Sequence, residues 1–428
     1  MTPGSSTQCT VDNSETPQCS NELYSDYSQT VFSSDQASRD LAYLIQNYSP
    51  SKSKIIVYGV SYGTLWLTRF VQNFPSLANG VIFDSVVSSY GSVKTTLDNW
   101  DAVGDEVLKK YFALCDADSY CSSKLPGGAT NYVLGVLNGL YSNGTVCPAV
   151  LSMFPTSESL LTLMNSLLQS NQQRILIPAL FYRINRCRSD DVALLGVYAP
   201  QNASTTVPCD PSYNQLLFNY VAFSELFNAN LTQTELAVRN EALTFNAAIS
   251  TGMFATRELW STFFNWALFD KPISPATNVL VLGGQLDCQT PIEDTTAFET
   301  SLNVTNGQLI FGQAVNGNHA VILEIGTDGS NCGLDIVANF ASNPSGVQNL
   351  SCLKNLLHYD FQGTSKLNLA IAYTSDLYDG DAQITETLYP QSVFIAMVVL
   401  AAALAVCTLG LAVGLAVYCG NKAANRVV

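Results

Sequence analysis

A serine flanked by two glycines is the residue of this sequence whose setting best suits catalysis. The segment KIIVYGVSYGTLWLTRFVQNFP, from Lys54 to Pro75, places Ser61 between Gly59 and Gly63 in the pattern Gly-x-Ser-x-Gly. The short pattern alone is weak evidence, but an apolar run precedes it and a helical pattern follows it. A nucleophile elbow needs this order of strand, sharp turn and helix. The hydroxyl of Ser61 then becomes a nucleophile if a base removes its proton.

Two histidines, His319 and His358, are the only candidates for that base. His319 lies in VNGNHAVI, just after an apolar segment typical of a strand, whereas His358 lies in a helical pattern and is better explained as a surface or packing residue. The orienting acid is expected between the serine and the histidine in the sequence. Asp287, in GGQLDCQTP, lies 32 residues before His319 and is favoured. Asp84 is the rival, because it ends the strand after the elbow.

The elements around Ser61 are predicted from apolar spacing. Ile55 to Val57 form a β-branched run typical of a buried parallel strand. After it, apolar residues at i, i+3, i+4 and i+7 predict a helix that ends before Pro75. The backbone N–H of Tyr62, at the start of this helix, is expected to point at the developing oxyanion.

The rest of the chain predicts a sheet interrupted by helices. Ser33 and Gln36 have the spacing of a helix cap before the elbow strand, and Asn79 to Val87 follows as a second strand. From about Ser92 to Asp270 the periodicity is helical, and strand patterns resume at 278–282 and 308–311. Helices inserted between strands of one parallel sheet are expected to form a cap above the strand ends, where ligands bind.

Composition excludes some function classes and indicates an oxidising compartment. A net charge of −15 with only 19 lysines and arginines argues against nucleic-acid binding. Two histidines and no metal-type cysteine spacing argue against a metal site, and no cofactor is expected. Ten of the twelve cysteines precede residue 393. The spacing suggests disulfides Cys9–Cys19, Cys115–Cys121 and Cys332–Cys352, and N-glycosylation signals begin at Asn47, Asn143, Asn202, Asn230, Asn303 and Asn349.

The C-terminal segment predicts a membrane span. Val393 to Cys419 contains 27 residues without a charge, more than the roughly 20 needed to cross a bilayer. Lys422 and Arg426 follow, which favours a type I orientation with the preceding chain outside the cytoplasm or in a lumen. A removable lipid-anchor signal is the alternative, although nine further residues follow the apolar stretch. Residues 1–20 do not resemble a signal peptide, so either the chain is a fragment or the span directs insertion.

With these residues in hand, the chain resembles the α/β-hydrolase branch of serine peptidases that includes tripeptidyl and prolyl aminopeptidases. The resemblance covers about Cys19 to Cys352 and implies an α/β-hydrolase fold with Ser61 as nucleophile, Asp287 as acid and His319 as base. It also implies removal of residues from peptide N-termini beneath a helical cap. The family has further strands before the elbow, one of which supplies a second oxyanion donor, so the resemblance implies a partial parallel sheet here. Cys288, beside the acid, is expected to form a disulfide.

The resulting hypothesis is a membrane-anchored, glycosylated serine exopeptidase that acts on peptides outside the cytoplasm. An esterase or lipase of the same fold is the chemical alternative, since the triad does not distinguish amides from esters. A non-catalytic adhesion ectodomain or an inactive fragment is the other alternative. The expected organisation is a first part of the core (1–91), a cap (92–270), a second part of the core (271–365), a linker (366–391), a membrane helix (392–419) and a cytoplasmic tail (420–428).

Overall fold

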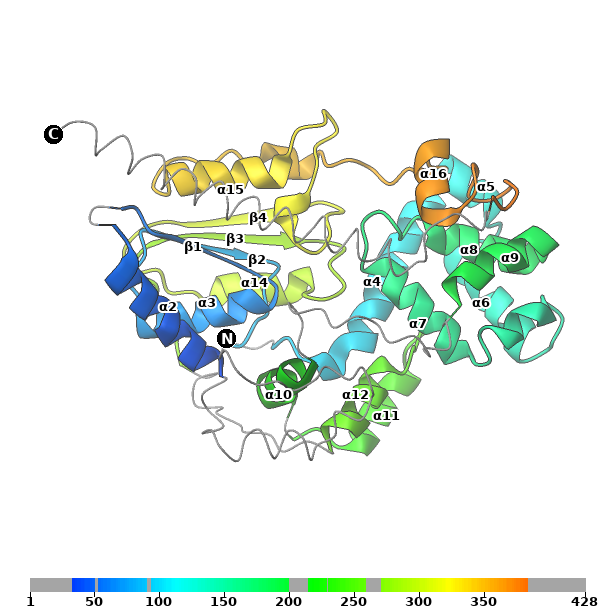
Figure 1. Ribbon diagram of the computed structural model, residues 1–428, viewed down its shortest axis with the longest axis horizontal. Coiled ribbons are helices and arrows are strands. Elements are labelled where there is room, and N and C mark those ends of the chain that lie inside the picture. Colours follow the sequence, from blue (N-terminus) through cyan, green and yellow to red (C-terminus); the bar gives the residue numbers. More distant parts are fainter. Residues whose placement is uncertain are drawn as a thin grey trace.

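A sheet of parallel strands forms the core of one half of the molecule, on the left in Figure 1. The computed structural model describes residues 33–50, 53–90, 94–199, 215–228, 230–258 and 271–383. Within them the strands are β1 (Ile56–Val60), β2 (Gly80–Asp84), β3 (Asn278–Gly284) and β4 (Leu309–Ala314), hydrogen-bonded in the order β1-β2-β3-β4. The sequence predicted all four, and the chain therefore has the expected α/β class with a parallel sheet. Strand β2 is shorter than expected, because Ser85 leaves the strand with φ of 57°.

Alternating side chains of the sheet enter two separate cores. Val81 and Phe83 of β2 pack on one face with residues of α2 (Ser34–Tyr48), α3 (Tyr62–Asn73) and α14 (Ile292–Ser301). Ile82 of β2 packs on the other face with residues of α15 (Cys332–Ser342) and its neighbouring turns, η4 (Val321–Leu323) and η5 (Ser351–Lys354). Figure 1 shows these helices on opposite faces of the sheet. Both faces of β2 are buried, which explains its continuous apolar run.

A block of helices is inserted between β2 and β3, and the described residues between these strands contain no strand. Its largest core is formed by helices that include α4, α6, α7 and α8, and Tyr111, Phe112 and Phe181 are fully buried there. Figure 1 places this block beside the sheet, at the carboxyl ends of the strands. The elements are η2 (Leu97–Asn99), α4 (Trp100–Ala117), α5 (Ser119–Lys124), α6 (Ala129–Tyr141), η3 (Pro148–Ser152), α7 (Ser157–Leu168), α8 (Leu176–Arg186), α9 (Ser189–Tyr198), α10 (Gln215–Glu225), α11 (Gln233–Glu241) and α12 (Ile249–Arg257).

The chain returns to this cap after the last strand. Helix α16 (Ser365–Ala372) contributes Ile371 and Ala372 to the cap core, so part of the expected linker is helical. Arg183 of α8 donates hydrogen bonds to the carbonyl oxygens of Leu377, at 2.6 Å, and Gly380, at 2.8 Å. In the part of the chain that the structure describes, no helix is both long and apolar enough to cross a membrane. The predicted span, 392–419, lies outside the described residues.

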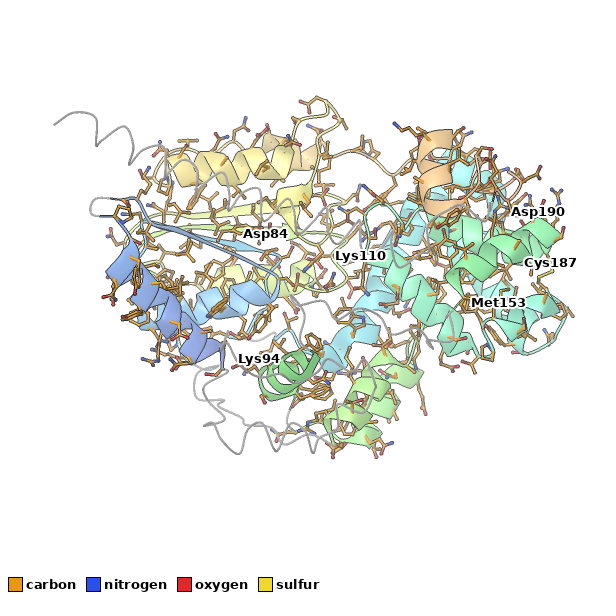
Figure 2. All side chains as sticks on the ribbon, viewed as in Figure 1. Asp84, Lys94, Lys110, Met153, Cys187 and Asp190 are labelled. Atoms are coloured by element: carbon orange, nitrogen blue, oxygen red, sulfur yellow. A yellow bond between two sulfur atoms is a disulfide. The ribbon has the colours of Figure 1, made fainter. Side chains whose placement is uncertain are left out.

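Three disulfides join described cysteines. Cys115–Cys121 and Cys332–Cys352 are pairs that the spacing suggested, and the third is Cys147–Cys187. Figure 2 shows Cys187 and Met153 at the end of the cap farthest from Asp84. Cys9, Cys19 and Cys209 lie outside the described residues. Cys288 does not form the expected disulfide with any cysteine of the described ranges: it is free there and buried in the cap core.

Candidate active site

Ser61 occupies a sharp turn between β1 and α3, as the elbow pattern predicts. Its backbone has φ of 54° and ψ of −129°, a conformation that is costly for a residue with a Cβ atom. Two hydrogen bonds hold the turn: the N–H of Ser61 donates to the carbonyl oxygen of Asp84 at 3.0 Å, and the N–H of Thr64 donates to that of Ser61 at 2.9 Å. The strain is thus maintained by β2 on one side and by the first turn of α3 on the other.

Only one of the two motif glycines is required by close packing. A Cβ atom on Gly59 would lie 2.6 Å from the carbonyl oxygen of Gly63, so strand and helix could not approach as they do. A Cβ atom on Gly63 would have no atom within 4 Å. Close packing of strand and helix therefore requires glycine at position 59 and permits a larger residue at position 63.

Asp287 lies in the turn after β3, fully buried, with hydrogen-bond donors around its carboxylate. The N–H groups of Gln289 and Thr290 donate to Oδ1 at 2.9 Å each, and the Thr290 hydroxyl donates to Oδ2 at 2.7 Å. Burial of Asp287 raises its pKa. The charge of His319, the hydrogen bond to His319 and the two hydrogen bonds from Thr290 outweigh this effect, so the pKa of Asp287 is lowered. Asp287 is therefore held as a carboxylate.

His319 lies in the loop after β4 and forms a pair with Asp287. Its Nδ1 is 2.9 Å from Oδ2 and 3.0 Å from Oδ1 of this carboxylate. Burial lowers the pKa of His319, but the charge of Asp287, the hydrogen bond to it and the charge of Asp84 raise it above the ordinary value. The tautomer that donates from Nδ1 to Asp287 leaves Nε2 able to accept a proton.

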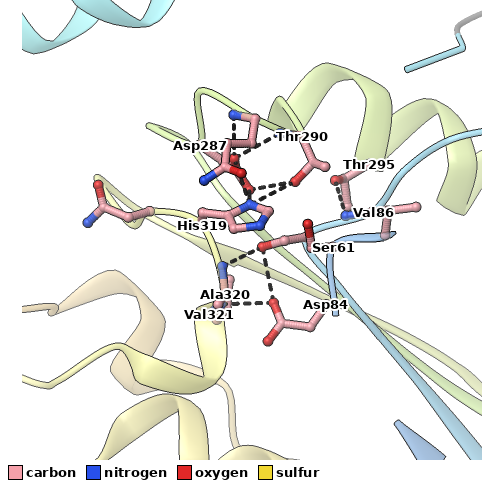
Figure 3. A network of polar contacts seen from close by, with 12 residues as sticks. Ser61, Asp84, Val86, Asp287, Thr290, Thr295, His319, Ala320 and Val321 are labelled. Atoms are coloured by element: carbon pink, nitrogen blue, oxygen red, sulfur yellow. Dashed lines mark hydrogen bonds and ion pairs between the residues drawn. The ribbon is translucent and has the colours of Figure 1, made fainter. Parts of the chain in front are cut away.

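Ser61 and the loop that carries His319 are held at the same edge of the sheet. The N–H of Ser61 donates to the carbonyl oxygen of Asp84 at 3.0 Å, and the N–H of Ala320 donates to Oγ of the next residue, Ser85, at 2.8 Å. In the view of Figure 3, Ser61 is drawn next to the imidazole ring of His319, whose Nδ1 contacts Asp287 and Thr290. Among the described residues the Ser61 hydroxyl forms no hydrogen bond with His319. Such contacts are often long in ligand-free sites and shorten when substrate binds. The N–H of Tyr62, the first residue of α3, has no acceptor inside the helix and is available at the same edge.

Asp84, the rival acid, has a different role in the structure. Its carboxylate accepts hydrogen bonds from the N–H groups of Val321, at 2.8 Å, and Ile322, at 3.0 Å, and from the Tyr58 hydroxyl at 2.8 Å. The neighbouring Ser85 Oγ accepts from the N–H of Ala320 at 2.8 Å. Asp84 and Ser85 therefore hold the backbone directly after His319, a function that the sequence analysis missed.

The second histidine does not belong to the site. His358 is exposed and lies in an irregular segment rather than in the helix that its surroundings predicted. Within the described ranges, no group of three or more His, Cys, Asp or Glu side chains is arranged to hold a metal ion.

Comparisons with known proteins add little to this geometry. No protein-family model matches the chain, and no curated protein matches it. Among solved structures, a single-site mutant of the epoxide hydrolase from Solanum tuberosum is 15% identical, with a TM-score of 0.25 over 68% of this chain and 72% of the other. A laboratory-evolved variant of potato epoxide hydrolase is 14% identical, with a TM-score of 0.26 over the same shares. At these TM-scores the assignment of the site rests on its own geometry.

Proposed function

We propose that the chain is a serine hydrolase that removes residues from peptide N-termini. The observation that carries the hydrolase proposal is the Asp287–His319 pair, joined at 2.9 Å, beside a serine held at φ of 54° at the start of a helix. Acyl transfer requires a nucleophile, a general base and an acid that orients the base. The hydroxyl of Ser61, Nε2 of His319 and the buried carboxylate of Asp287 can fill these three roles. The proposal of a peptide substrate is based on the resemblance of the sequence to aminopeptidases.

The reaction would use each residue in a distinct role. Ser61 Oγ attacks the carbonyl carbon while His319 Nε2 takes its proton, and Asp287 stabilises the imidazolium that forms. The N–H of Tyr62 donates to the oxyanion, near the positive end of α3. His319 then returns the proton to the leaving amine, and water repeats the sequence to release the acyl group.

We also propose that the protein acts outside the cytoplasm, anchored by residues 392–419. The three disulfides support an oxidising compartment. The five glycosylation signals in the described ranges support it as well, because each of their asparagines is exposed: Asn47, Asn143, Asn230, Asn303 and Asn349. The sixth, Asn202, and the anchor itself lie outside the described residues.

A fluorophosphonate probe tests the nucleophile directly. The purified protein should be labelled at Ser61, and labelling should be lost in Ser61→Ala and fall at least a hundredfold in His319→Ala. His358→Ala is the matched control, since this exposed histidine lies outside the site, and it should react like the unaltered protein. Labelling that survives Ser61→Ala in a folded protein contradicts the assignment.

Substrate class needs a separate assay. A peptide with a free N-terminus should lose its first residues, whereas the acetylated peptide should remain intact. Equal cleavage of both peptides excludes an aminopeptidase, and turnover of esters without any peptide cleavage points to the esterase alternative.

A further inference from the structure

A buried arginine of the cap contacts the loops that carry both Asp287 and His319. Arg174 lies between α7 and α8 and is 1% exposed. Its Nη1 and Nη2 donate long hydrogen bonds, 3.4 and 3.5 Å, to the carbonyl oxygen of Leu286, the residue before Asp287. Nη2 also donates to the carbonyl oxygen of Leu168, at the end of α7. The side chain therefore connects the cap to the turn that contains Leu286 and Asp287, which we call the acid turn.

A second series of hydrogen bonds leads from Arg174 to the loop that contains Asn318 and His319, which we call the histidine loop. Its Nη1 donates to the Tyr359 hydroxyl at 3.1 Å, and this hydroxyl donates to Oδ1 of Asn318 at 2.8 Å. Asn318 precedes His319 and is itself fixed, because its N–H and Nδ2 donate to Oε1 of Glu324. The two series of hydrogen bonds thus end on the residues directly before Asp287 and His319.

The way in which Arg174 is buried argues against a role in packing alone. No carboxylate forms an ion pair with it among the described side chains, and its Nε has no hydrogen-bond partner. The guanidinium carbon instead lies 5.8 Å from the ring centre of Tyr111 and 5.6 Å from that of Tyr359. A buried charge without a carboxylate is expensive, and an apolar side chain of similar volume would fill such a place at lower cost. A role in positioning Leu286 and Tyr359 explains why an arginine occupies this buried site.

We propose that Arg174 is a positioning residue of the proposed serine hydrolase: from the cap it fixes the acid turn through Leu286 and the histidine loop through Tyr359. The inference rests on the proposed function and deepens it, because the cap then controls the geometry of the Asp287–His319 pair. The loops also touch directly, since the N–H of Leu286 donates to the carbonyl oxygen of Gly317 at 2.8 Å. Arg174 and Tyr359 add hydrogen bonds that hold Leu286 and Asn318 from the direction of the cap.

The test compares Arg174→Lys, Arg174→Met and Tyr359→Phe with Arg183→Lys as matched control. Arg183 is also a buried arginine of the cap, but it holds residues 376–380 and not the catalytic loops. Tyr359→Phe removes only the hydroxyl, so it keeps the test open if Arg174→Met does not fold. We expect the three site variants to lose about tenfold to a hundredfold in Ser61 labelling rate per folded molecule. Arg183→Lys should lower thermal stability and leave this rate unchanged.

An NMR titration of His319 separates positioning from general stability. The charged groups that act on His319 are Asp287 and Asp84, and a loosened Asp287 contact should lower the pKa of His319 in the three site variants. The chain has two histidines, so His319→Ala assigns the signals. Site variants that match the unaltered protein in labelling rate and in the pKa of His319 overturn the proposal. An unaltered protein that is not labelled at Ser61 contradicts the proposed function instead, while the NMR titration still tests the role of Arg174.

Discussion

At the scale of single residues, the site depends on how two carboxylates near one imidazole are separated in role. Asp287 contacts the ring of His319, whereas Asp84 contacts the backbone of Val321 and Ile322 and acts on the ring only through its charge. Both are fully buried, so neither role follows from exposure. The hydrogen-bond partners decide which carboxylate is the orienting acid.

The raised pKa of His319 predicts a pH dependence of Ser61 labelling. The ring must be neutral to accept the proton of Ser61, so labelling should fall as the pH decreases through the pKa of His319. Half-maximal rate is expected above about pH 6.5, the ordinary histidine value. Asp287→Asn should lower the rate by about 10⁴-fold and move the midpoint to lower pH. A midpoint that Asp287→Asn leaves in place would show that Asp287 does not act on His319.

Asp84→Asn should disturb the loop behind His319. An amide oxygen accepts from fewer partners than a carboxylate, and its NH₂ group cannot accept from Val321, Ile322 or Tyr58. We expect a loss of about 1–3 kcal/mol in the free energy of unfolding and a slower labelling of Ser61. Tyr58→Phe is the control, because it removes only the Tyr58 donor and leaves the carboxylate with its other donors. Denaturant unfolding and labelling rates measure both effects, and equal losses in the two variants would argue against a special role of Asp84.

At the scale of elements, the elbow is a contact between β1 and α3 that permits no Cβ atom at Gly59. Gly59→Ala should cost about 1–3 kcal/mol of unfolding free energy, because its methyl group meets the backbone of Gly63 at 2.6 Å. Gly63→Ala has open space and should be neutral, or stabilising by up to about 1 kcal/mol, since alanine favours the helix. Thermal denaturation of the two variants compares them directly. Similar losses at both positions would contradict the asymmetry.

The elbow could be predicted from sequence because its parts are consecutive residues. The strand, the turn and the helix all lie between Ile56 and Asn73, and their apolar spacing is local. The histidine and the acid followed from chain order and from the turn residues around them. The contacts of Asp84 with Val321 and of Arg174 with Leu286 could not be predicted, because 237 and 112 residues separate the partners. No spacing rule connects positions that meet only when the sheet forms, as Asp84 and Val321 do, or when the cap packs against the strand ends, as Arg174 and Leu286 do.

At the scale of the whole molecule, two separate segments of the chain form the cap. The first runs from the end of β2 to the start of β3, and the second follows the last strand and contains α16. Residues 376–380 of the second segment accept hydrogen bonds from Arg183 of the first. The cap core also contains Leu286 and Cys288, which flank Asp287. The cap core therefore continues into the turn that contains Asp287, and changes in packing directly around Leu286 and Cys288 are expected to reach Asp287.

The surface of the same molecule predicts where carbohydrate is attached. Asn143, Asn230, Asn303 and Asn349 are exposed in loops or turns, whereas Asn47 is exposed within α2 and donates from Nδ2 to the carbonyl oxygen of Tyr43 at 2.8 Å. Glycosylation signals are used at exposed loops of secreted chains, so we expect the four loop sites to be more fully modified than Asn47. Peptide mass spectrometry after enzymatic deglycosylation of protein from a eukaryotic secretory host measures the occupancy of each site. Unmodified asparagines at all five positions would contradict the proposed location outside the cytoplasm, while Ser61 labelling would still test the hydrolase chemistry.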